Sequence, residues 1–349
     1  SGPATTGQDT TDMTLQMDLP PAPEALALPS PLEHLRDPRT RAALRIQQAL
    51  VAGARSFLCS DGAVEMAHPV IGPVTDPGSR GAKQVDVDYY GHRYKLMTSA
   101  ILYKQASLLA FDRIFLVAPN VRLEPVETSS THRHLTEFRQ IDVEYAGATR
   151  DDAMGVVERL IRHAVTTAVD ECGDDLAVLG RDPDALRRYV ARPFARVPHG
   201  EVVDGLRRDG YPQAAGTEIE WEAEERISRQ ADAPFFIVGY PKGSRGFYDK
   251  ESPAEPGTLL NFDLIAPEGC GELCSGSERE HDYAALVTRM RETGENPSKY
   301  AWYLEVARHG IPSSAGFGIG LERLTRWVTG LDSAWRTTAF PKIAGVVSP

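Results

Sequence analysis

The sequence is poor in cysteine, with only four among its 349 residues. Cys59, Cys172, Cys270 and Cys274 show neither the density nor the spacing of a disulfide framework or of a four-ligand zinc site, so we expect neither. No apolar run approaches the roughly 20 residues that a membrane-spanning helix needs, and residues 1–30 carry no basic-then-apolar targeting signal. These absences predict a cytoplasmic protein without a membrane partner.

An excess of basic residues is absent too. Lysine and arginine together number 38, against 49 aspartates and glutamates, which gives a net charge of −11 at pH 7. A protein with this charge gains little from the attraction to phosphate that underlies most nucleic-acid binding. The charge therefore argues against a nucleic-acid partner.

Large apolar side chains are scarce at the start of the chain. Residues 1–30 are rich in Thr, Pro, Ala and acidic residues, a composition typical of segments that do not fold alone. The chain as a whole has 42% hydrophobic residues, which is enough for a large core. We predict a mobile tail over residues 1–30 and one folded domain over residues 31–349.

Periodicity predicts which segments form helices and strands. Apolar residues recur every three or four positions between Pro38 and Phe57, which is typical of a long amphipathic helix. The apolar run at 114–118 and the alternating run at 138–145 predict two antiparallel strands joined by a polar connection. Further strands are predicted at 235–238, 246–248 and 259–265. Strands in the middle of the chain and helices at both ends indicate an α+β fold around an antiparallel sheet.

The polar connection between the first two predicted strands carries candidate binding residues. It contains Arg122, Glu124, Arg133 and His134 and ends at Phe138. Each residue alone is typical of a solvated loop. Together they offer guanidinium groups for phosphate oxygens, a carboxylate for an exocyclic amine and a ring that can stack on a base. The connection is thus a candidate nucleotide site.

A glycine-rich segment, Gly316 to Gly320, precedes a predicted helix that contains Arg323. A glycine-rich turn before a helix is a weak signal by itself, because it serves close packing more often than ligand binding. Its position in the chain after the polar connection makes the combination far more specific.

The polar connection and the glycine-rich segment resemble motifs 2 and 3 of the class II aminoacyl-tRNA synthetases, in the aspartyl/asparaginyl branch. The segment that ends in His68-Pro69 resembles motif 1, which forms the dimer interface in that class. The similarity runs from about residue 38 to the end. It implies an antiparallel sheet flanked by helices, and a homodimer. We expect no anticodon-binding barrel, since residues 1–37 are too few to form one.

The resemblance also implies roles for residues at these positions. The implied ATP-binding residues are Arg122, Glu124, His134, Phe138, Gly320 and Arg323, with Arg122 and Arg323 as the catalytic pair. Asp263 and Glu272 would hold Mg²⁺ on the ATP phosphates, a task for hard oxygen ligands.

For the amino-acid substrate, the resemblance points to two cations. Lys104 and Arg279 align with residues that hold the side-chain carboxylate of aspartate, and Ser99 and Arg245 complete the predicted substrate site. Two buried cations favour aspartate over asparagine, because a neutral amide would leave their charge uncompensated.

Three departures from the synthetase pattern bear on function: the connection between Arg122 and His134 is longer, Ile101 stands where glutamine is common, and Ser314 stands where histidine is usual. With the segments 75–83 and 118–125, they resemble the archaeal-type asparagine synthetase related to asparaginyl-tRNA synthetase. This implies ATP-dependent adenylation of an aspartate carboxyl group and amide formation with ammonia, with the glycine- and proline-rich segment 72–83 as a lid.

Three alternatives stay open. The first is a biosynthetic ligase that uses an aspartate analogue or another small amine. The second is a truncated aspartyl- or asparaginyl-tRNA synthetase paralogue that acts on tRNA, against which the acidic charge and the missing barrel argue. The third is a non-catalytic paralogue, which the presence of Arg122, Arg323 and the acidic pair disfavours.

Overall fold

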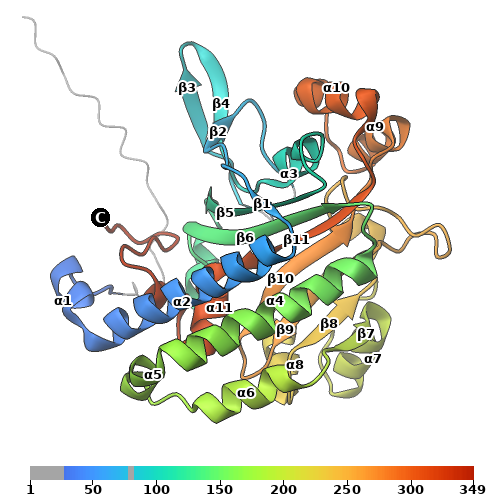
Figure 1. Cartoon of the computed structure of the whole chain (residues 1–349). Helices are drawn as coiled ribbons and strands as arrows, with labels where there is room; N and C mark the ends of the chain where they lie inside the picture. Colours follow the sequence, from blue (N-terminus) through green and yellow to red (C-terminus); the bar gives the residue numbers. More distant parts are fainter. Residues whose placement is uncertain (1–26, 78–81) are drawn as a thin grey trace, which may run out of the picture.

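The computed structural model describes residues 27–77 and 82–349, and Figure 1 shows their arrangement. The predicted tail at 1–30 therefore falls largely outside the described residues, although Ser30 is described and caps helix α1 (Pro31–Arg36). Part of the predicted lid at 72–83 also lies outside them. No helix of the described ranges is long and apolar enough to cross a membrane.

An eight-stranded sheet forms the centre of the molecule, in the order β1-β5-β6-β11-β10-β9-β8-β7. All neighbouring pairs from β5 to β8 are antiparallel, and the edge strands β1 and β7 join in parallel. Within the described ranges neither sheet closes into a barrel. The predicted α+β fold around an antiparallel sheet is confirmed. The strands are β1 (Val64–Glu65), β5 (Arg113–Val121), β6 (Glu137–Ala146), β7 (Ala195–Pro198), β8 (Phe235–Val238), β9 (Asn261–Ala266), β10 (Gly271–Glu278) and β11 (Ser314–Gly320).

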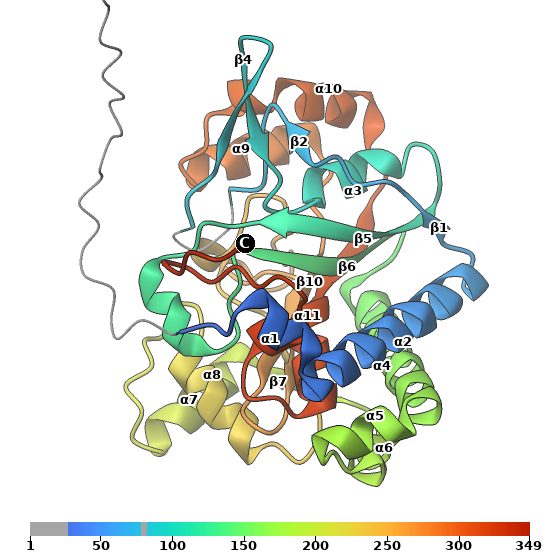
Figure 2. The ribbon, with the colours of Figure 1, turned by 90° about the vertical axis from the view of Figure 1, so that its left-hand side faces the viewer.

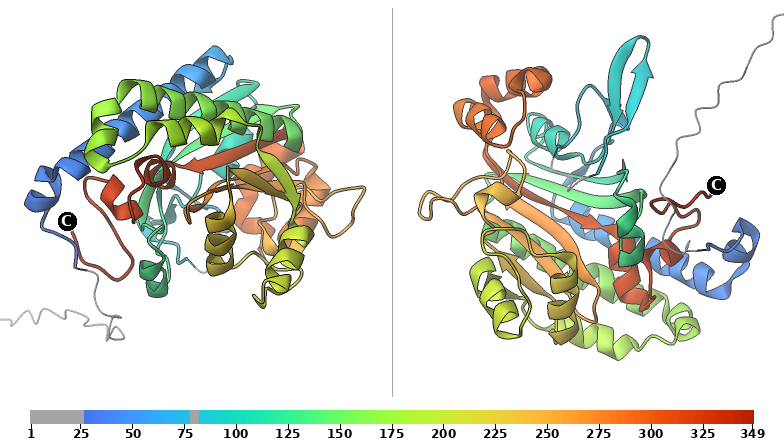
Figure 3. Two further views of the ribbon diagram at one scale, coloured as in Figure 1. Left: turned by 90° about the horizontal axis from the view of Figure 1, so that it is seen from below. Right: turned by 180° about the vertical axis from the view of Figure 1, so that it is seen from behind.

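Long helices cover one face of this sheet. Helix α2 (Pro38–Ser60) begins where Asp37 caps it and runs three residues beyond the predicted end. Helix α4 (Arg150–Glu171) packs along α2, and α11 (Leu321–Thr329) fills the space beside them, as Figures 1 and 3 show. Their apolar residues share one core with alternate residues of the strands, such as Ile141 and Val143 of β6. On the opposite face, Ile237 and Ile265 pack against helical residues of 199–223, and β5 packs against the residues that flank helix 101–107, so only the middle of that face is left to carry a site.

The remaining helices are shorter than α2 and α4. They are α3 (Ile101–Ser107), α5 (Gly173–Leu179), α6 (Pro183–Ala191), α7 (His199–Arg208), α8 (Trp221–Gln230), α9 (Tyr283–Glu292) and α10 (Ala301–Gly310). A small second sheet, β2 (Ile71–Gly72), β3 (Asp86–Tyr89) and β4 (His92–Leu96), projects from the body of the protein beside α3 (Figure 2). The sequence patterns did not predict this small sheet or the hairpin that β3 and β4 form in it.

Two local predictions were wrong. Residues 246–248 form a turn and not a strand, because Phe247 packs into a cluster with residues of α9 and α10 while Tyr248 donates to Asp76. The glycine-rich segment is strand β11 and not a turn. A Cβ at Gly316 would meet the Glu144 carboxylate, and a Cβ at Gly318 would meet Asp142, so the glycines make room for carboxylates on the neighbouring strand.

We expect Gly316→Ala to destabilise the protein by roughly 1–3 kcal/mol, because the added methyl meets a backbone carbonyl and the buried Glu144 carboxylate, neither of which can move freely. Urea unfolding followed by circular dichroism measures the effect. Gly200→Ala is the control, since its Cβ meets nothing within 4 Å and alanine favours the helix. Equal stabilities of the Gly316 variant and the wild type would contradict this account of β11.

A candidate adenylation site over the middle of the sheet

A cavity of about 310 Å³ lies on the face of the sheet opposite α2 and α4, over the middle strands β6, β11 and β10. Its walls come from β6, β10 and β11, from helix α3, from the connection after β5 and from the loop 242–249. Gln140 and Asp142 of β6 line it, while Ile141 and Val143 between and beyond them face the core. The alternation of the strand thus decides which side chains reach the site.

The predicted ATP-binding residues converge at one end of the cavity. Arg122, Glu124, Phe138 and Arg323 all line it. The Arg122 guanidinium lies 5.0 Å from the centre of the Phe138 ring, and its Nε donates to the Thr98 carbonyl at 3.0 Å. Arg122 is therefore held over the ring on which a purine would stack.

Arg323 extends from the first turn of α11, directly after Gly320. Its guanidinium donates to the backbone carbonyls of Arg133 and Glu272, and it lies 3.4 Å from the Glu272 carboxylate. Gly320 also lines the cavity, and a Cβ there would come within 3.4 Å of the Arg323 side chain. The end of β11 thereby aims Arg323 into the cavity.

His134 also lines this end, where burial, Arg323 and Arg133 together lower its pKa to about 2. A ring with this pKa is neutral near pH 7, so it can only offer a phosphate oxygen a neutral N–H donor. Its Nδ1 lies 2.5 Å from the Thr131 hydroxyl, which fixes the ring orientation.

This low pKa makes stability depend on pH. Between pH 2 and pH 6.5 the unfolded chain takes up a proton that folded His134 does not, so its contribution to stability falls as the pH falls below about 6.5. The slope is about 1.4 kcal/mol per pH unit. In denaturant unfolding between pH 7.5 and 5.5, the free energy of unfolding should fall less steeply with decreasing pH for His134→Asn than for the wild type. Parallel curves would contradict the assignment.

Arg133 has a structural role in an ion pair, which the motif did not predict. It is buried and forms an ion pair with Glu224 of α8, and Glu224 in turn accepts from the Glu272 backbone N–H at 2.5 Å. Gly271, at a φ of +72°, leaves space for this pair. The pair ties the connection after β5 to α8 and to the start of β10.

The predicted metal ligands lie on neighbouring strands. Arg245 donates to both oxygens of buried Asp263, at 3.2 and 2.6 Å, and Glu272 lies beside Arg323. In the described part of the chain no three acidic, histidine or cysteine side chains form a ready metal site. Glu272 lines the cavity, whereas Asp263 is buried beneath Arg245 and is not among the lining residues. Both are carboxylates, the ligand type that suits Mg²⁺, and their role as metal ligands stays a prediction.

Arg245 itself lines the cavity from the loop 242–249. Besides Asp263, it contacts Glu218 and the Ser275 hydroxyl, and its guanidinium lies 4.3 Å from the centre of the Tyr240 ring. A direct contact of Arg245 with the substrate stays a prediction.

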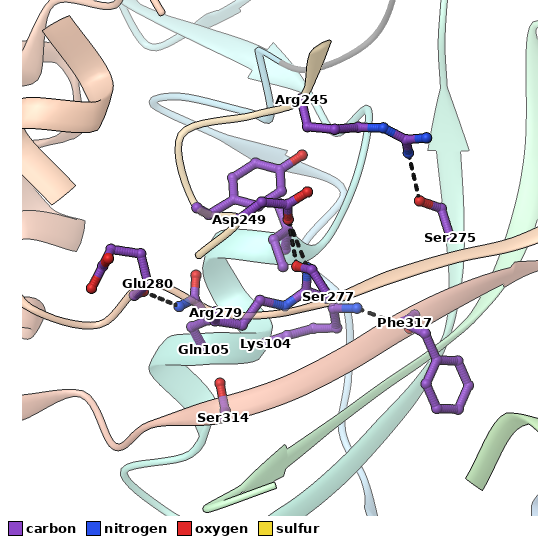
Figure 4. Close-up of polar contacts among 12 residues, drawn as sticks. Lys104, Gln105, Arg245, Asp249, Ser275, Ser277, Arg279, Glu280, Ser314 and Phe317 are labelled. Atoms are coloured by element: carbon purple, nitrogen blue, oxygen red, sulfur yellow. Dashed lines mark hydrogen bonds and ion pairs between the residues drawn. The ribbon is translucent and has the colours of Figure 1, made fainter. Parts of the chain in front are cut away.

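Lys104 and Arg279 meet at the other end of the cavity, as predicted for the substrate site, and Figure 4 shows both. Lys104 Nζ donates to Asp142 at 2.9 Å and to the Phe317 carbonyl at 3.0 Å. Arg279 pairs with Glu144 at 3.1 Å and with Asp249 at 3.4 Å. Ser99 lines the same end, just before α3.

Three carboxylates at this end were missed as site residues, namely Asp142, Glu144 and Asp249. The alternation of residues 138–145 places Asp142 and Glu144 on the polar face of one strand, and this pattern could have indicated that they line a site. Nothing in the sequence indicated Asp249, whose loop folds back from another part of the chain. Burial raises the pKa of Asp249, against the opposing effects of Arg279 and Ser277.

Comparison with known proteins places this site in a family. The family model of the class II tRNA synthetases (D, K and N) matches residues 24–344. The asparagine-tRNA ligase of Thermococcus kodakarensis is 34% identical over 316 residues, covering 90% of this chain and 72% of that protein. The asparagine-tRNA ligase of Lactobacillus delbrueckii is 33% identical over 315 residues.

Solved structures place the chain in the same family as the sequence comparisons do. The asparaginyl-tRNA synthetase of Pyrococcus horikoshii, complexed with asparaginyl-adenylate, superposes with a TM-score of 0.86 at 32% identity, covering 91% of this chain and 72% of that one. The chain belongs to the class II aminoacyl-tRNA synthetase family. Within it, the chain falls in the aspartyl/asparaginyl branch, and it is an AMP-forming ligase of the aminoacyl-tRNA synthetase type that uses ATP.

These relatives correct one expectation. The net charge argued against a tRNA partner, yet asparagine-tRNA ligases are similar to this chain over nine-tenths of its length. Net charge sums over the whole surface and says nothing of local charge: Arg122, Arg133 and Arg323 line the nucleotide end of the cavity although the chain as a whole is acidic. The predicted homodimer, the Mg²⁺ requirement and the cytoplasmic location stay predictions.

We expect Glu272→Gln to lower ATP-pyrophosphate exchange by about 100-fold or more and to raise the Mg²⁺ concentration it requires, because the amide cannot neutralise a metal that carries the departing pyrophosphate. Exchange measured across a Mg²⁺ titration checks both effects. Glu225→Gln, on α8 and outside the cavity lining, is the matched control. An unchanged Mg²⁺ dependence would remove Glu272 from the metal site.

Proposed function

We propose that the protein adenylates the carboxyl group of a four-carbon amino acid, aspartate or asparagine, and transfers it to the 3′ end of tRNA. The observation that carries the proposal is the single cavity, which joins the nucleotide end at Arg122 and Arg323 to the amino-acid end at Lys104 and Arg279. A carboxylate bound between these ends would lie beside the α-phosphate of ATP.

The first reaction step would use residues that are already in place. The carboxylate oxygen attacks the α-phosphorus, the bond to the bridging oxygen breaks, and pyrophosphate leaves. Arg122, between the two ends, offsets the charge that develops on the α-phosphate, and Arg323 pairs with the outer phosphates. Asp263 and Glu272 would hold a Mg²⁺ ion, which when bound would supply positive charge to the departing pyrophosphate.

The second step needs an acceptor that attacks the adenylate and releases AMP. Support for a ribose hydroxyl of tRNA comes from the relatives, which are asparagine-tRNA ligases of which this chain covers 72%. Support for the adenylate itself comes from the solved relative that holds asparaginyl-adenylate.

A second candidate acceptor is ammonia, which would give an amide. The observation that favours it is Asp142, whose Oδ2 is buried at the cavity with no hydrogen-bond partner among the described residues. Such an oxygen would accept from a small donor-rich molecule. The same oxygen also suits the substrate's own N–H groups, so it supports the second candidate less than the relatives support the first.

The deciding experiment compares acceptors. Purified protein is incubated with ATP, Mg²⁺ and labelled aspartate or asparagine, with either total tRNA or ammonium chloride, and the products are separated as aminoacyl-RNA and free amide. We expect aminoacyl-RNA, and an Arg323→Ala control that forms none. Free asparagine from aspartate and ammonium without charged RNA would establish the second candidate, and no ATP-pyrophosphate exchange with either amino acid would refute the adenylation itself.

A further inference from the structure

We propose that Thr75 and Thr98 are positioning residues for the adenylation step, and that a ring of hydrogen bonds between them fixes the carbonyl group that holds Arg122. The proposal rests on the proposed function, in which Arg122 offsets the charge that develops on the α-phosphate. Neither threonine is among the residues that line the cavity, so both act through Arg122 and not by contact with a substrate.

Thr98 lies in the short connection between β4 and helix α3, and its backbone carbonyl contacts the catalytic arginine. The carbonyl oxygen accepts from Arg122 Nε at 3.0 Å. Because the guanidinium is planar, a hydrogen bond at Nε also directs the N–H groups at its far end, which are the ones that pair with a phosphate. The direction of the Thr98 carbonyl therefore sets the direction of the Arg122 guanidinium.

Thr98 is held in turn by the segment 75–76. The side chains of Thr75 and Thr98 are both 1% exposed, so their hydrogen bonds are made within the protein. The Thr98 backbone N–H donates to Thr75 Oγ1 at 2.9 Å, and the Thr98 hydroxyl donates to the Asp76 carbonyl at 3.0 Å. The two threonine hydroxyl oxygens lie 3.0 Å apart.

The direction of the hydrogen bond between the two hydroxyls follows from the number of protons. A hydroxyl carries one proton, and Thr98 gives its proton to the Asp76 carbonyl. Thr75 therefore donates to the Thr98 hydroxyl while it accepts from the Thr98 backbone. In the resulting ring each hydroxyl donates once and accepts once, and each hydrogen bond strengthens the next.

The backbone just before Thr98 is attached to two further segments. The Met97 N–H donates to the Val70 carbonyl, and the Met97 carbonyl accepts from the Val121 N–H, both at 2.9 Å. These hydrogen bonds fix the peptide group that precedes Thr98, and the threonine ring fixes the residue itself. Opening the ring thus loosens the carbonyl at Arg122 without breaking the attachment to β5.

The first test is ATP-pyrophosphate exchange with Thr75 variants of the full chain. Valine keeps the branched shape of threonine and lacks the hydroxyl, so Thr75→Val opens the ring without leaving a cavity. We expect kcat to fall by about tenfold or more and the KM of ATP to change by less than about threefold, because the contact of Arg122 strengthens in the transition state. Thr75→Ser keeps the hydroxyl and should restore kcat.

Arg122→Lys separates a positioning role from a purely structural one. Lysine has no N–H at the position of Nε, so Thr75→Val added to Arg122→Lys should lower kcat no further. A purely structural role would lower kcat by the same factor in both backgrounds. Thr329→Val is the matched control and should leave kcat as it is, because its buried hydroxyl bonds within α11 and it lies outside the cavity lining.

The Arg122 Nε–H proton gives a second readout that requires no catalysis. In the nuclear magnetic resonance spectrum of isotope-labelled protein, its signal is identified by its absence from Arg122→Lys. We expect Thr75→Val to increase the rate at which this proton exchanges with solvent by about tenfold or more, because the carbonyl that accepts it is loosened. Thr329→Val should leave the rate unchanged.

An unchanged kcat in folded Thr75→Val would overturn the proposal, and so would a loss of equal size in the two backgrounds. If Thr75→Val fails to fold, Thr98→Val and Thr98→Ser give the same comparison from the other side of the ring. Faster solvent exchange of the Arg122 proton, in a protein without ATP-pyrophosphate exchange, would refute the adenylation and leave the positioning standing. ATP-pyrophosphate exchange by the wild type together with an unaltered Arg122 proton in Thr75→Val would refute the positioning alone.

Discussion

Glu144 is fully buried in the central strand β6, and the site is organised around its charge. It accepts from Arg279 at 3.1 Å and from Ser314 at 2.9 Å, and it lies 3.7 Å from the Lys104 ammonium. A buried carboxylate is tolerated only with such partners, because the loss of hydration costs several kcal/mol per ion. Its neighbour on β11 has to be Gly316, since any Cβ there would meet it.

The cavity divides electrostatically into two ends. Arginines dominate the nucleotide end, where burial, together with Arg323 and Arg133, lowers the pKa of His134 so far that the ring adds no further positive charge. Carboxylates balance or exceed the cations at the amino-acid end. An anionic triphosphate and a donor-bearing amino acid are thereby directed to opposite ends of one cavity. The net charge of −11 is a sum over the whole chain and hides this local separation, so the prediction from it that the protein has no nucleic-acid partner was wrong.

The buried pairs also join parts of the chain that are far apart. Arg133 and Glu224 are 91 positions apart in sequence, yet their pair sets the connection after β5 against α8 and the start of β10. Arg279 joins β10 to β6 and to the loop that carries Asp249. Opening either ion pair would leave an unpaired buried charge, which is costly. The pairs therefore hold the walls of the cavity at fixed positions.

The sequence by itself determined the fold class, the long helix α2, the pair β5 and β6, and the motif residues and the two cations that line the ends of the cavity. These follow from local periodicity and from ordered motifs, which depend on near neighbours in the chain. Only the tertiary structure decided that Gly316 to Gly320 form a strand, because the reason is the Glu144 side chain across the sheet. Likewise it decided the charge balance around Lys104 and Arg279. Asp249 reaches them by a turn of the loop 242–249, and no local pattern records a contact between segments that meet only when the chain has folded.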